Sequence, residues 1–306
     1  METADHEAPR RHDQRGLPAR PGDRLHPQRL PDDKVAGAGA YLFKVQEPFL
    51  LRGRRGRPQN PCEPQYPPAG ANIDYYLAEE PAGELRLEIL DGRGNLVRRF
   101  SSEPASPMTG LPGLRTREWN AGQAETPGLQ KTAGMHRFVW DLRYPGPWDA
   151  DDRRSGQGGP LVPPATYQAR LTLGSWSQTV PIKPKMDPRV LNEGITPADV
   201  TAQAELALKA RDLLSKARLT AEYSKNAIDK HPADQTLTEI KEKLITAPVR
   251  YSRPMLVDQS SYLYSNLNTA DQRPGRDAYQ RYDELADLLE LQIQKLEAAL
   301  ERMKIP

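Results

Sequence analysis

Between Asn72 and about Lys183, the hydrophobic positions recur at every second residue. A period of two is typical of β-strands that bury one face. The cluster Asp91–Asn95 predicts the turn of a β-hairpin. Gly174-Ser175 predicts a two-residue turn, because glycine adopts positive φ without steric cost. Six such strands, joined by turns and not by crossover helices, predict two antiparallel sheets packed face to face. The expected fold of residues 71–186 is therefore an Ig-like β-sandwich, without the cysteine pair of antibody domains.

Past Pro188 the period becomes helical. Thr196 is a favourable N-cap and Pro197 fits the first helical position, so we expect a long helix to begin there. Further helices are expected at about 233–245 and 256–268, and a last one towards the C-terminus. The last helix carries an apolar seam, formed by Leu285, Leu289, Ile293, Leu296 and Leu300. A coiled-coil dimer could use this seam, but so few heptads favour packing within the chain. Residues 195–306 are thus predicted to form a separate α-helical bundle of three long helices and one short helix.

The first 40 residues show neither period. Residues 1–31 hold six arginines, no lysine and five prolines, with almost no apolar residues. Such a segment buries too little surface to offset its ordering entropy. Two readings stay open: a disordered leader, or a stretch translated off-frame, since GC-rich DNA read out of frame gives Arg/Pro/His-rich sequence. Residues 41–70 are interpreted as an irregular linker, with short extended pieces near 41–43 and 49–51.

Composition removes several functional classes. The 43 basic and 41 acidic residues leave a net charge of +2, and no basic patch is interleaved with aromatic residues, so no nucleic-acid partner is expected. No apolar run approaches the roughly 20 residues that cross a bilayer, so no membrane span is expected. The start of the chain lacks the apolar core of a secretory signal, which leaves its localisation undetermined. A single cysteine, Cys62, excludes an internal disulfide and a cysteine-built zinc site.

The sequence contains no recognisable catalytic, phosphate-binding or metal-binding motif, so we predict no catalytic residue, cofactor or metal site. Asp149, Asp151 and Asp152 form an acidic cluster that could attract calcium. Arginines follow at once and no EF-hand pattern is present, which favours a solvated loop. His136 is expected to be a core or rim histidine and not a ligand. Cys62 has no neighbour that would lower the pKa of a nucleophile.

Two aromatic residues, Tyr144 and Trp148, lie in a Pro/Gly-rich turn after the predicted strand that contains Trp140. Exposed aromatics in such loops stack on sugar rings or anchor a partner protein. We therefore single them out as a candidate partner or glycan surface. The alternative is that they cap the open end of the sandwich.

Several runs resemble the C-terminal region of a large bacterial family whose members carry sortilin-like, BNR-type β-propeller repeats and are often labelled glycosyl hydrolases. The most specific runs are W-D-L-R-Y-P (140–145) and P-P-x-T-Y (163–167), and others lie at 40–44, 67–77, 87–102 and 159–173. The resemblance covers about residues 40–306. It implies a propeller first, then a sandwich similar to the Ig-like domain of flagellar hook-capping proteins, then a helical tail. Ala165 departs from the glycine usual in the family.

The propeller repeats are the larger departure, because no Asp-box of the form S-x-D-x-G-x-x-W occurs in this chain. Any hydrolase site of the family would lie in those repeats, so no catalytic residue is carried over. The family is typically exported, which implies an extracytoplasmic location. We interpret the chain as a non-catalytic accessory region that packs on a β-propeller or a partner protein. Its start, where a last propeller blade would end, favours the off-frame or truncated-gene reading of residues 1–31.

Two alternatives remain. A glycoside-hydrolase-like enzyme would need Asp149, Asp151, Asp152 or Glu118 to converge with another carboxylate across a cleft. A carbohydrate-binding module would use Trp148 to stack on a sugar.

Overall fold

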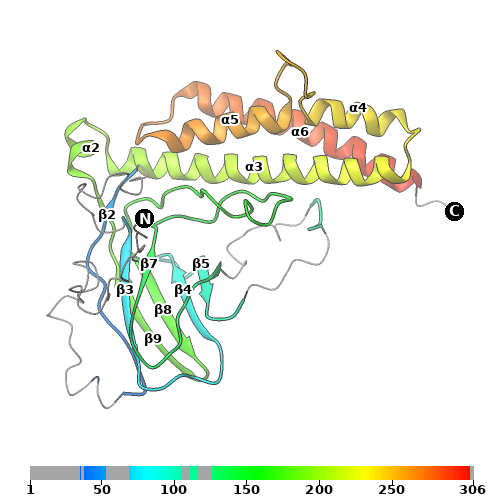
Figure 1. Cartoon of the computed structure of the whole chain (residues 1–306). Coiled ribbons are helices and arrows are strands. Elements are labelled where there is room, and N and C mark those ends of the chain that lie inside the picture. Colours follow the sequence, from blue (N-terminus) through cyan, green and yellow to red (C-terminus); the bar gives the residue numbers. More distant parts are fainter. Residues whose placement is uncertain (1–34, 36–37, 53–68, 105–110, 116–125, 304–306) are drawn as a thin grey trace, which may run out of the picture.

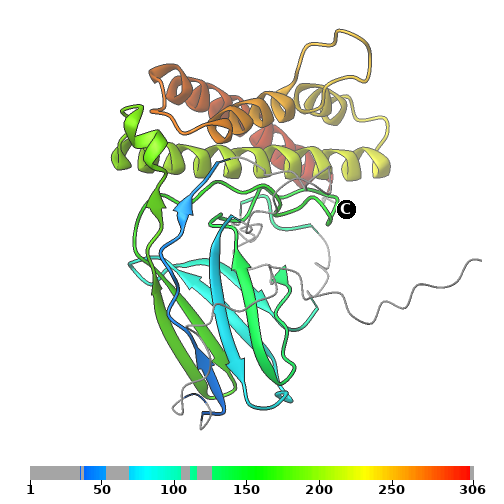
Figure 2. The same ribbon diagram turned by 60° about the vertical axis from the view of Figure 1, so that its left-hand side comes forward.

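The computed structural model describes residues 35, 38–52, 69–104, 111–115 and 126–303. Strands stand beneath a layer of helices that lies across one end of the sheets (Figure 1). A view turned by 60° shows the same arrangement, with the strands running up to the helices (Figure 2). The expected leader, residues 1–40, lies almost wholly outside the described residues.

Two sheets form the lower layer. The first contains β1 (Ala40–Leu42), β3 (Ala71–Leu77) and β7 (Gly134–Trp140), in the order β1-β3-β7. The second has the order β6-β5-β4-β8-β9 and contains β4 (Leu85–Leu90), β5 (Leu96–Ser101), β6 (Thr126–Pro127), β8 (Tyr167–Leu173) and β9 (Trp176–Ile182). The long strands pair antiparallel, which confirms the predicted antiparallel sheets. Gly174 has φ 55° in the two-residue turn between β8 and β9, where glycine was expected.

Two short pairings are parallel and were not predicted. β6 pairs with β5, and β2 (Phe49–Leu50) pairs with β10 (Lys185–Met186). The strand β1 pairs with β3, so the start of the predicted irregular linker belongs to a sheet. The side-chain amide of Gln178, on β9, forms two hydrogen bonds with the backbone of Leu42, on β1. Its Oε1 atom accepts from the Leu42 amide and its Nε2 atom donates to the Leu42 carbonyl oxygen, both at 2.9 Å. This side chain therefore joins the edges of the two sheets, which a hydrophobic pattern cannot reveal.

The two sheets bury a common hydrophobic core. Ile73 and Leu77 come from the first sheet, Leu87 and Leu171 from the second, and all four are fully buried in one cluster. Burial of each large apolar side chain contributes roughly 1.5–3 kcal/mol to stability. Alternation of apolar residues along these strands is what places them on the same side, as the sequence predicted.

Charged residues on the other faces are more buried than the alternating pattern suggests. Asp74, on β3, is fully buried and accepts two bonds from Arg137 on β7, at 2.7 and 3.0 Å. Glu88, on β4, pairs with Arg99 on β5 and with Arg170 on β8, both directly opposite it. Opposite charges at facing positions stabilise a given strand register.

The upper layer contains the short α2 (Pro188–Asn192) and the helices α3 (Pro197–Lys230), α4 (Gln235–Leu244), α5 (Leu256–Thr269) and α6 (Arg276–Met303). The first three predicted helix starts lie within two residues of those observed. The leucine seam of α6 is buried within the chain, with Leu285 and Leu296 fully buried against the other helices, so the seam packs in cis. None of the helices in the described ranges combines the length and apolar character needed to cross a bilayer.

The start of α3 depends on a capping box. The Thr196 hydroxyl accepts from the amide of Asp199, and the Asp199 carboxylate accepts from the backbone amide and hydroxyl of Thr196. Arg273, from the turn before α6, donates to the same carboxylate at 2.6 Å. The bonds from Thr196 and Arg273 lower the pKa of Asp199 from 3.8 to about 2.

Because the folded-state pKa of Asp199 is depressed, its contribution to stability is present above about pH 4 and is lost as the pH falls towards 2. We expect Asp199→Asn to lower the melting temperature at neutral pH, and this difference from wild type to shrink between pH 4 and pH 2. Thermal unfolding followed by circular dichroism across that range measures it. Asp229→Asn, at an exposed position of the same helix, is the matched control. A difference independent of pH would contradict the electrostatic role of Asp199.

Candidate functional site

Tyr144, Trp148 and the cluster Asp149, Asp151 and Asp152 lie on one long loop between β7 and β8. Its two sides are bonded to each other: Tyr144 donates its amide to Pro160, and Gly146 donates to Gly156. A Cβ atom at Gly146 would lie 1.8 Å from the carbonyl oxygen of Gln157, so only glycine fits this crossing. The loop is therefore an ordered element. It runs beside α3 (Figure 1).

Trp148 lies between this loop and the helices and not on the surface. Only 5% of Trp148 is exposed, and it packs in a cluster with Leu219 of α3. Its amide donates to the Ser215 hydroxyl at 3.0 Å, and its carbonyl oxygen accepts from Arg218 at 3.1 Å. The ring is thus unavailable for stacking on a sugar in this conformation, and it joins the loop to the helix layer.

Tyr144 occupies a different place. It is half-buried, packs against the core shared by the sheets, and is hydrogen-bonded to Tyr167 of β8. Burial raises the pKa of Tyr144 above its ordinary value. This position fits the expected alternative of a residue that caps the core. The structure does not bring Tyr144 and Trp148 together as one exposed surface.

Asp149 is held by arginines. Its carboxylate is largely buried and pairs with Arg154 of the same loop at 2.9 Å and with Arg218 of α3 at 3.2 Å. Burial lowers the pKa of Arg218, a cost that the charge of Asp149 opposes. With two guanidinium groups bonded to it, the Asp149 carboxylate fastens the loop to α3.

The other acids of this loop are also accounted for. Asp151 pairs with Arg153 at 3.1 Å and with Arg154 at 3.6 Å, and these contacts lower its pKa. Asp152 is exposed. Glu118 lies outside the described residues. Asp149 lines a hollow of about 370 Å³ together with Glu222 of α3 and Asp258 of α5, but its carboxylate is paired there with Arg154 and Arg218.

His136 contacts the backbone and a neighbouring aromatic ring. His136 is half-buried at the rim of the first sheet, where its Nε2 atom lies 2.6 Å from the carbonyl oxygen of Thr132. Its ring lies 5.2 Å from that of Tyr75, between ring centroids. Cys62 is outside the described residues. Among the residues that the structure describes, no cluster of histidine, cysteine and acidic side chains could hold a metal ion.

The helices contact the loops that extend from the sheets. Tyr264 of α5 donates to Gly158 of the loop at 2.7 Å, and burial raises the pKa of this phenol to about 12. Arg115 donates to Glu290 and to Glu297 of α6 at 2.7–2.8 Å. The loop between β7 and β8 therefore contacts α3 and α5, and Arg115 provides a separate contact to α6.

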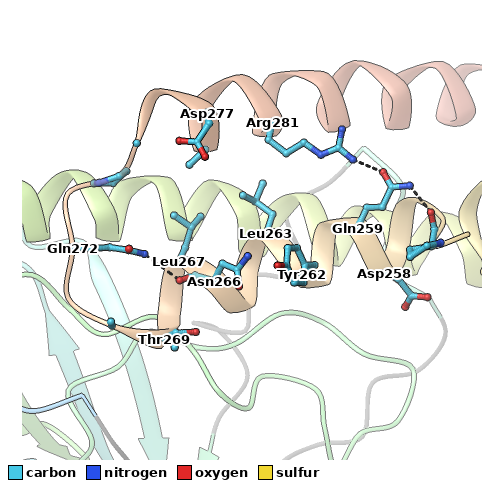
Figure 3. A pocket seen from close by; sticks show the side chains of 15 residues that line it. Asp258, Gln259, Tyr262, Leu263, Asn266, Leu267, Thr269, Gln272, Asp277 and Arg281 are labelled. Atoms are coloured by element: carbon cyan, nitrogen blue, oxygen red, sulfur yellow. Dashed lines mark hydrogen bonds between the residues drawn. The ribbon is translucent and has the colours of Figure 1, made fainter.

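A further cavity lies between α5 and the start of α6, and we call it the α5–α6 groove. Its volume is about 950 Å³. Figure 3 shows Leu263 and Leu267 of α5 pointing towards α6, with α3 behind them. Ala278 is the small residue of α6 that lines the opposite wall. A large side chain at that position would fill the space, so its small size keeps the groove open.

Polar side chains limit the groove at its ends. Arg281 of α6 donates to Gln259 of α5 at 2.6 Å, a bridge visible in Figure 3. At the other end, Gln272 donates to the carbonyl oxygen of Asn266 at 3.2 Å. Tyr262 stands on the rim and is 71% exposed. The groove thus offers an apolar floor between polar ends, an arrangement that suits a side of an amphipathic protein segment.

Two carboxylates line the groove, but they do not form a catalytic pair. Asp258 lies at the start of α5 and Asp277 at the start of α6, and the two appear at opposite ends of the groove in Figure 3. Carboxylates at opposite ends of a groove do not flank a single bond, as the two acids of a glycosidase must. Sequence reasoning missed this groove. Leucines of α5 were assigned to the core correctly, but the space left by Ala278 depends on how two helices pack.

No protein-family model and no curated protein sequence matches this chain.

Removal of the Trp148 side chain tests whether this residue joins the loop to the helices. We expect Trp148→Ala to lower the free energy of unfolding by about 3–5 kcal/mol, as for other buried aromatic residues. It should also separate helix unfolding, followed by circular dichroism at 222 nm, from sheet unfolding, followed by tryptophan fluorescence. Trp176→Ala, at a half-buried position of β9 away from the helices, is the control. A loss below about 1 kcal/mol with coincident transitions would show that Trp148 is not the joint.

Proposed function

We propose that the chain is a non-catalytic accessory region that binds other proteins. The observation that carries this proposal is the α5–α6 groove, whose floor is apolar and whose carboxylates lie at opposite ends. Apolar grooves between helices take the apolar face of a protein segment. Of the acids proposed from the sequence, Asp149 fastens the loop to α3 through Arg218.

The lower layer supports an Ig-like β-sandwich as the finer description of the fold. Two mainly antiparallel sheets share one core, and β1 lies next to β9 at their common edge. Trp140 is fully buried in that core and meets Tyr167 edge to face, with 5.7 Å between ring centroids. Sandwiches of this kind serve as binding and spacing modules in many unrelated proteins, so the fold alone does not name a ligand.

The partner suggested by the sequence resemblance is a β-propeller of the sortilin-like, BNR-repeat type. In that family the propeller precedes the sandwich, so it would meet the sheets near β1 and leave the helix layer free. This arrangement gives the two layers different tasks. The sheets attach to the propeller, and the groove in the helix layer faces further partners. Extracytoplasmic location is part of the same proposal.

The hydrolase alternative predicts turnover that depends on carboxylates. We expect the chain to release no nitrophenol from a panel of 4-nitrophenyl glycosides. We also expect Asp149→Asn to lower the melting temperature, because Arg218 then loses a charged partner. Asp277→Asn, at an exposed position of the groove, should leave both quantities unchanged. Turnover by the wild-type chain that either variant abolishes, with folding retained, would overturn the non-catalytic assignment.

The accessory role predicts a complex with a propeller. We expect isothermal titration calorimetry to detect binding between this chain and a BNR-repeat β-propeller that lacks its own C-terminal region. Leu288→Glu, which alters only the exposed side of α6, should bind equally well, because the propeller meets the sheets. The absence of a complex would contradict the propeller as partner, and loss of binding in Leu288→Glu would move the contact to the helix layer.

A further inference from the structure

Helix α6 carries a second regular stripe, on the side away from its buried leucine seam. The residues recur at alternating steps that sum to seven, the spacing of a coiled-coil seam. All of them are exposed in the structure. We call this set the outer stripe of α6, and its main members are Asp277, Glu284, Leu288, Leu291, Lys295 and Arg302.

The centre of the outer stripe is apolar. Leu288 and Leu291 are each 46% exposed, whereas the seam residues Leu285 and Leu289 next to them are buried. Two neighbouring exposed leucines on a regular helix indicate a surface that another element covers. Leu288 also lines a hollow of about 250 Å³ beside the stripe, between α6 and the start of α5. The stripe therefore borders the helix-layer surface assigned above to protein binding.

We propose that a second copy of this chain is the partner at this surface, with its α6 packed antiparallel against the outer stripe. The inference rests on the proposed function, because it names the partner of the helix layer. The two copies are related by a twofold axis that passes between Leu288 and Leu291. Leu288 of each copy then faces Leu291 of the other, which is the layer pairing of antiparallel helices.

The charges of the outer stripe favour this register. With the axis between the two leucines, Glu284 faces Lys295 of the second copy, each four residues beyond the nearest leucine of its own helix. Two turns farther out, Asp277 faces Arg302 of the second copy. Each pair occurs twice in a twofold dimer, so four attractive pairs flank the leucines. Facing opposite charges select a partner and a register more than they add affinity.

The parallel arrangement is excluded by the same residues. Parallel helices bring each stripe residue opposite its own copy, so Glu284 would face Glu284 and Lys295 would face Lys295. Every charged layer would then be repulsive. The antiparallel arrangement also places Arg281 over Ala298 of the second copy, where its aliphatic stem covers a small side chain.

Contacts within the chain do not compete strongly with this pairing. Glu284 pairs with Arg281 at 2.9 Å, and Arg302 approaches Asp234 at 3.9 Å, but all of these side chains are substantially exposed except that of Asp234. Exposed pairs contribute about 0–1 kcal/mol. Lys295 pairs with no carboxylate in the described part of the chain. The stripe is thus free to re-pair at low cost.

One pair of helices with two leucines from each copy makes a small interface, so we expect a dissociation constant of about 1–100 µM. Sedimentation velocity of the full chain across that range should show a mass that rises from monomer towards dimer. Leu288→Glu should keep the chain monomeric throughout. Leu191→Glu, at a leucine of α2 that is 45% exposed, is the matched control and should dimerise like wild type.

Charge reversal tests the register without altering the core. Glu284→Lys alone brings lysines together twice in a dimer, and Lys295→Glu alone brings glutamates together twice, so each single variant should be monomeric. An equimolar mixture of the two variants restores two attractive contacts between these positions. We expect that mixture to form a heterodimer, and the double variant Glu284→Lys/Lys295→Glu to form a homodimer.

Each alternative has its own result. A wild-type chain that stays monomeric across the range, or a dimer that Leu288→Glu does not disturb, would overturn the inference. A dimer that Leu288→Glu abolishes but that shows no rescue in the mixed variants would overturn the antiparallel register. Binding of the propeller with loss in Leu288→Glu, and no dimer, would assign the stripe to the propeller. None of these results depends on the glycoside assay, so failure of the dimer leaves the non-catalytic assignment standing.

Discussion

The burial of the loop between β7 and β8 beneath α3 is the constraint on which this architecture depends. Trp148 supplies the apolar contact, and Asp149 with Arg218 supplies a charged contact that fixes the loop on one side of the helix. A buried carboxylate without a partner lowers stability, so Asp149 and Arg218 depend on each other. The loop thereby joins the sheets and the helices, which have separate cores. Trp148 and Asp149, which the sequence suggested as binding or catalytic residues, form this contact.

Local pattern was sufficient to predict the long strands and helices, but not the short elements β6, β10 and α2. Alternation around Leu87 and Leu171 placed their strands and their buried faces, and Thr196 with Pro197 placed the start of α3. Pairing between distant segments was harder. Gln178 reaches Leu42 across the sheet edge, and Asp74 is buried because Arg137 lies opposite it. Neither contact leaves a periodic signal, because each depends on which strands become neighbours.

The contacts of the candidate site were even harder to predict from the sequence. The sequence identified Trp148 and the aspartates as unusual, and they are, but their partners Leu219 and Arg218 lie on a helix some 70 residues later. The α5–α6 groove depends on the small side chain of Ala278, which no sequence motif identifies. By contrast, the spacing of its residues is enough to define the outer stripe of α6. Its meaning became clear once the structure showed that the leucine seam of α6 is buried within the chain.

The crossing at Gly146 and Gly159 sets a rule for how this loop can vary. A Cβ atom at Gly159 would lie 1.7 Å from the carbonyl oxygen of Tyr144, so at both glycines the two backbone segments pass closer than any side chain permits. Residues beyond the crossing, around 150–155, form a tip that can change length or composition without moving the crossing. Evolutionary or engineered insertions would therefore be tolerated at that tip, while the crossing keeps Trp148 at a constant distance from the sheets.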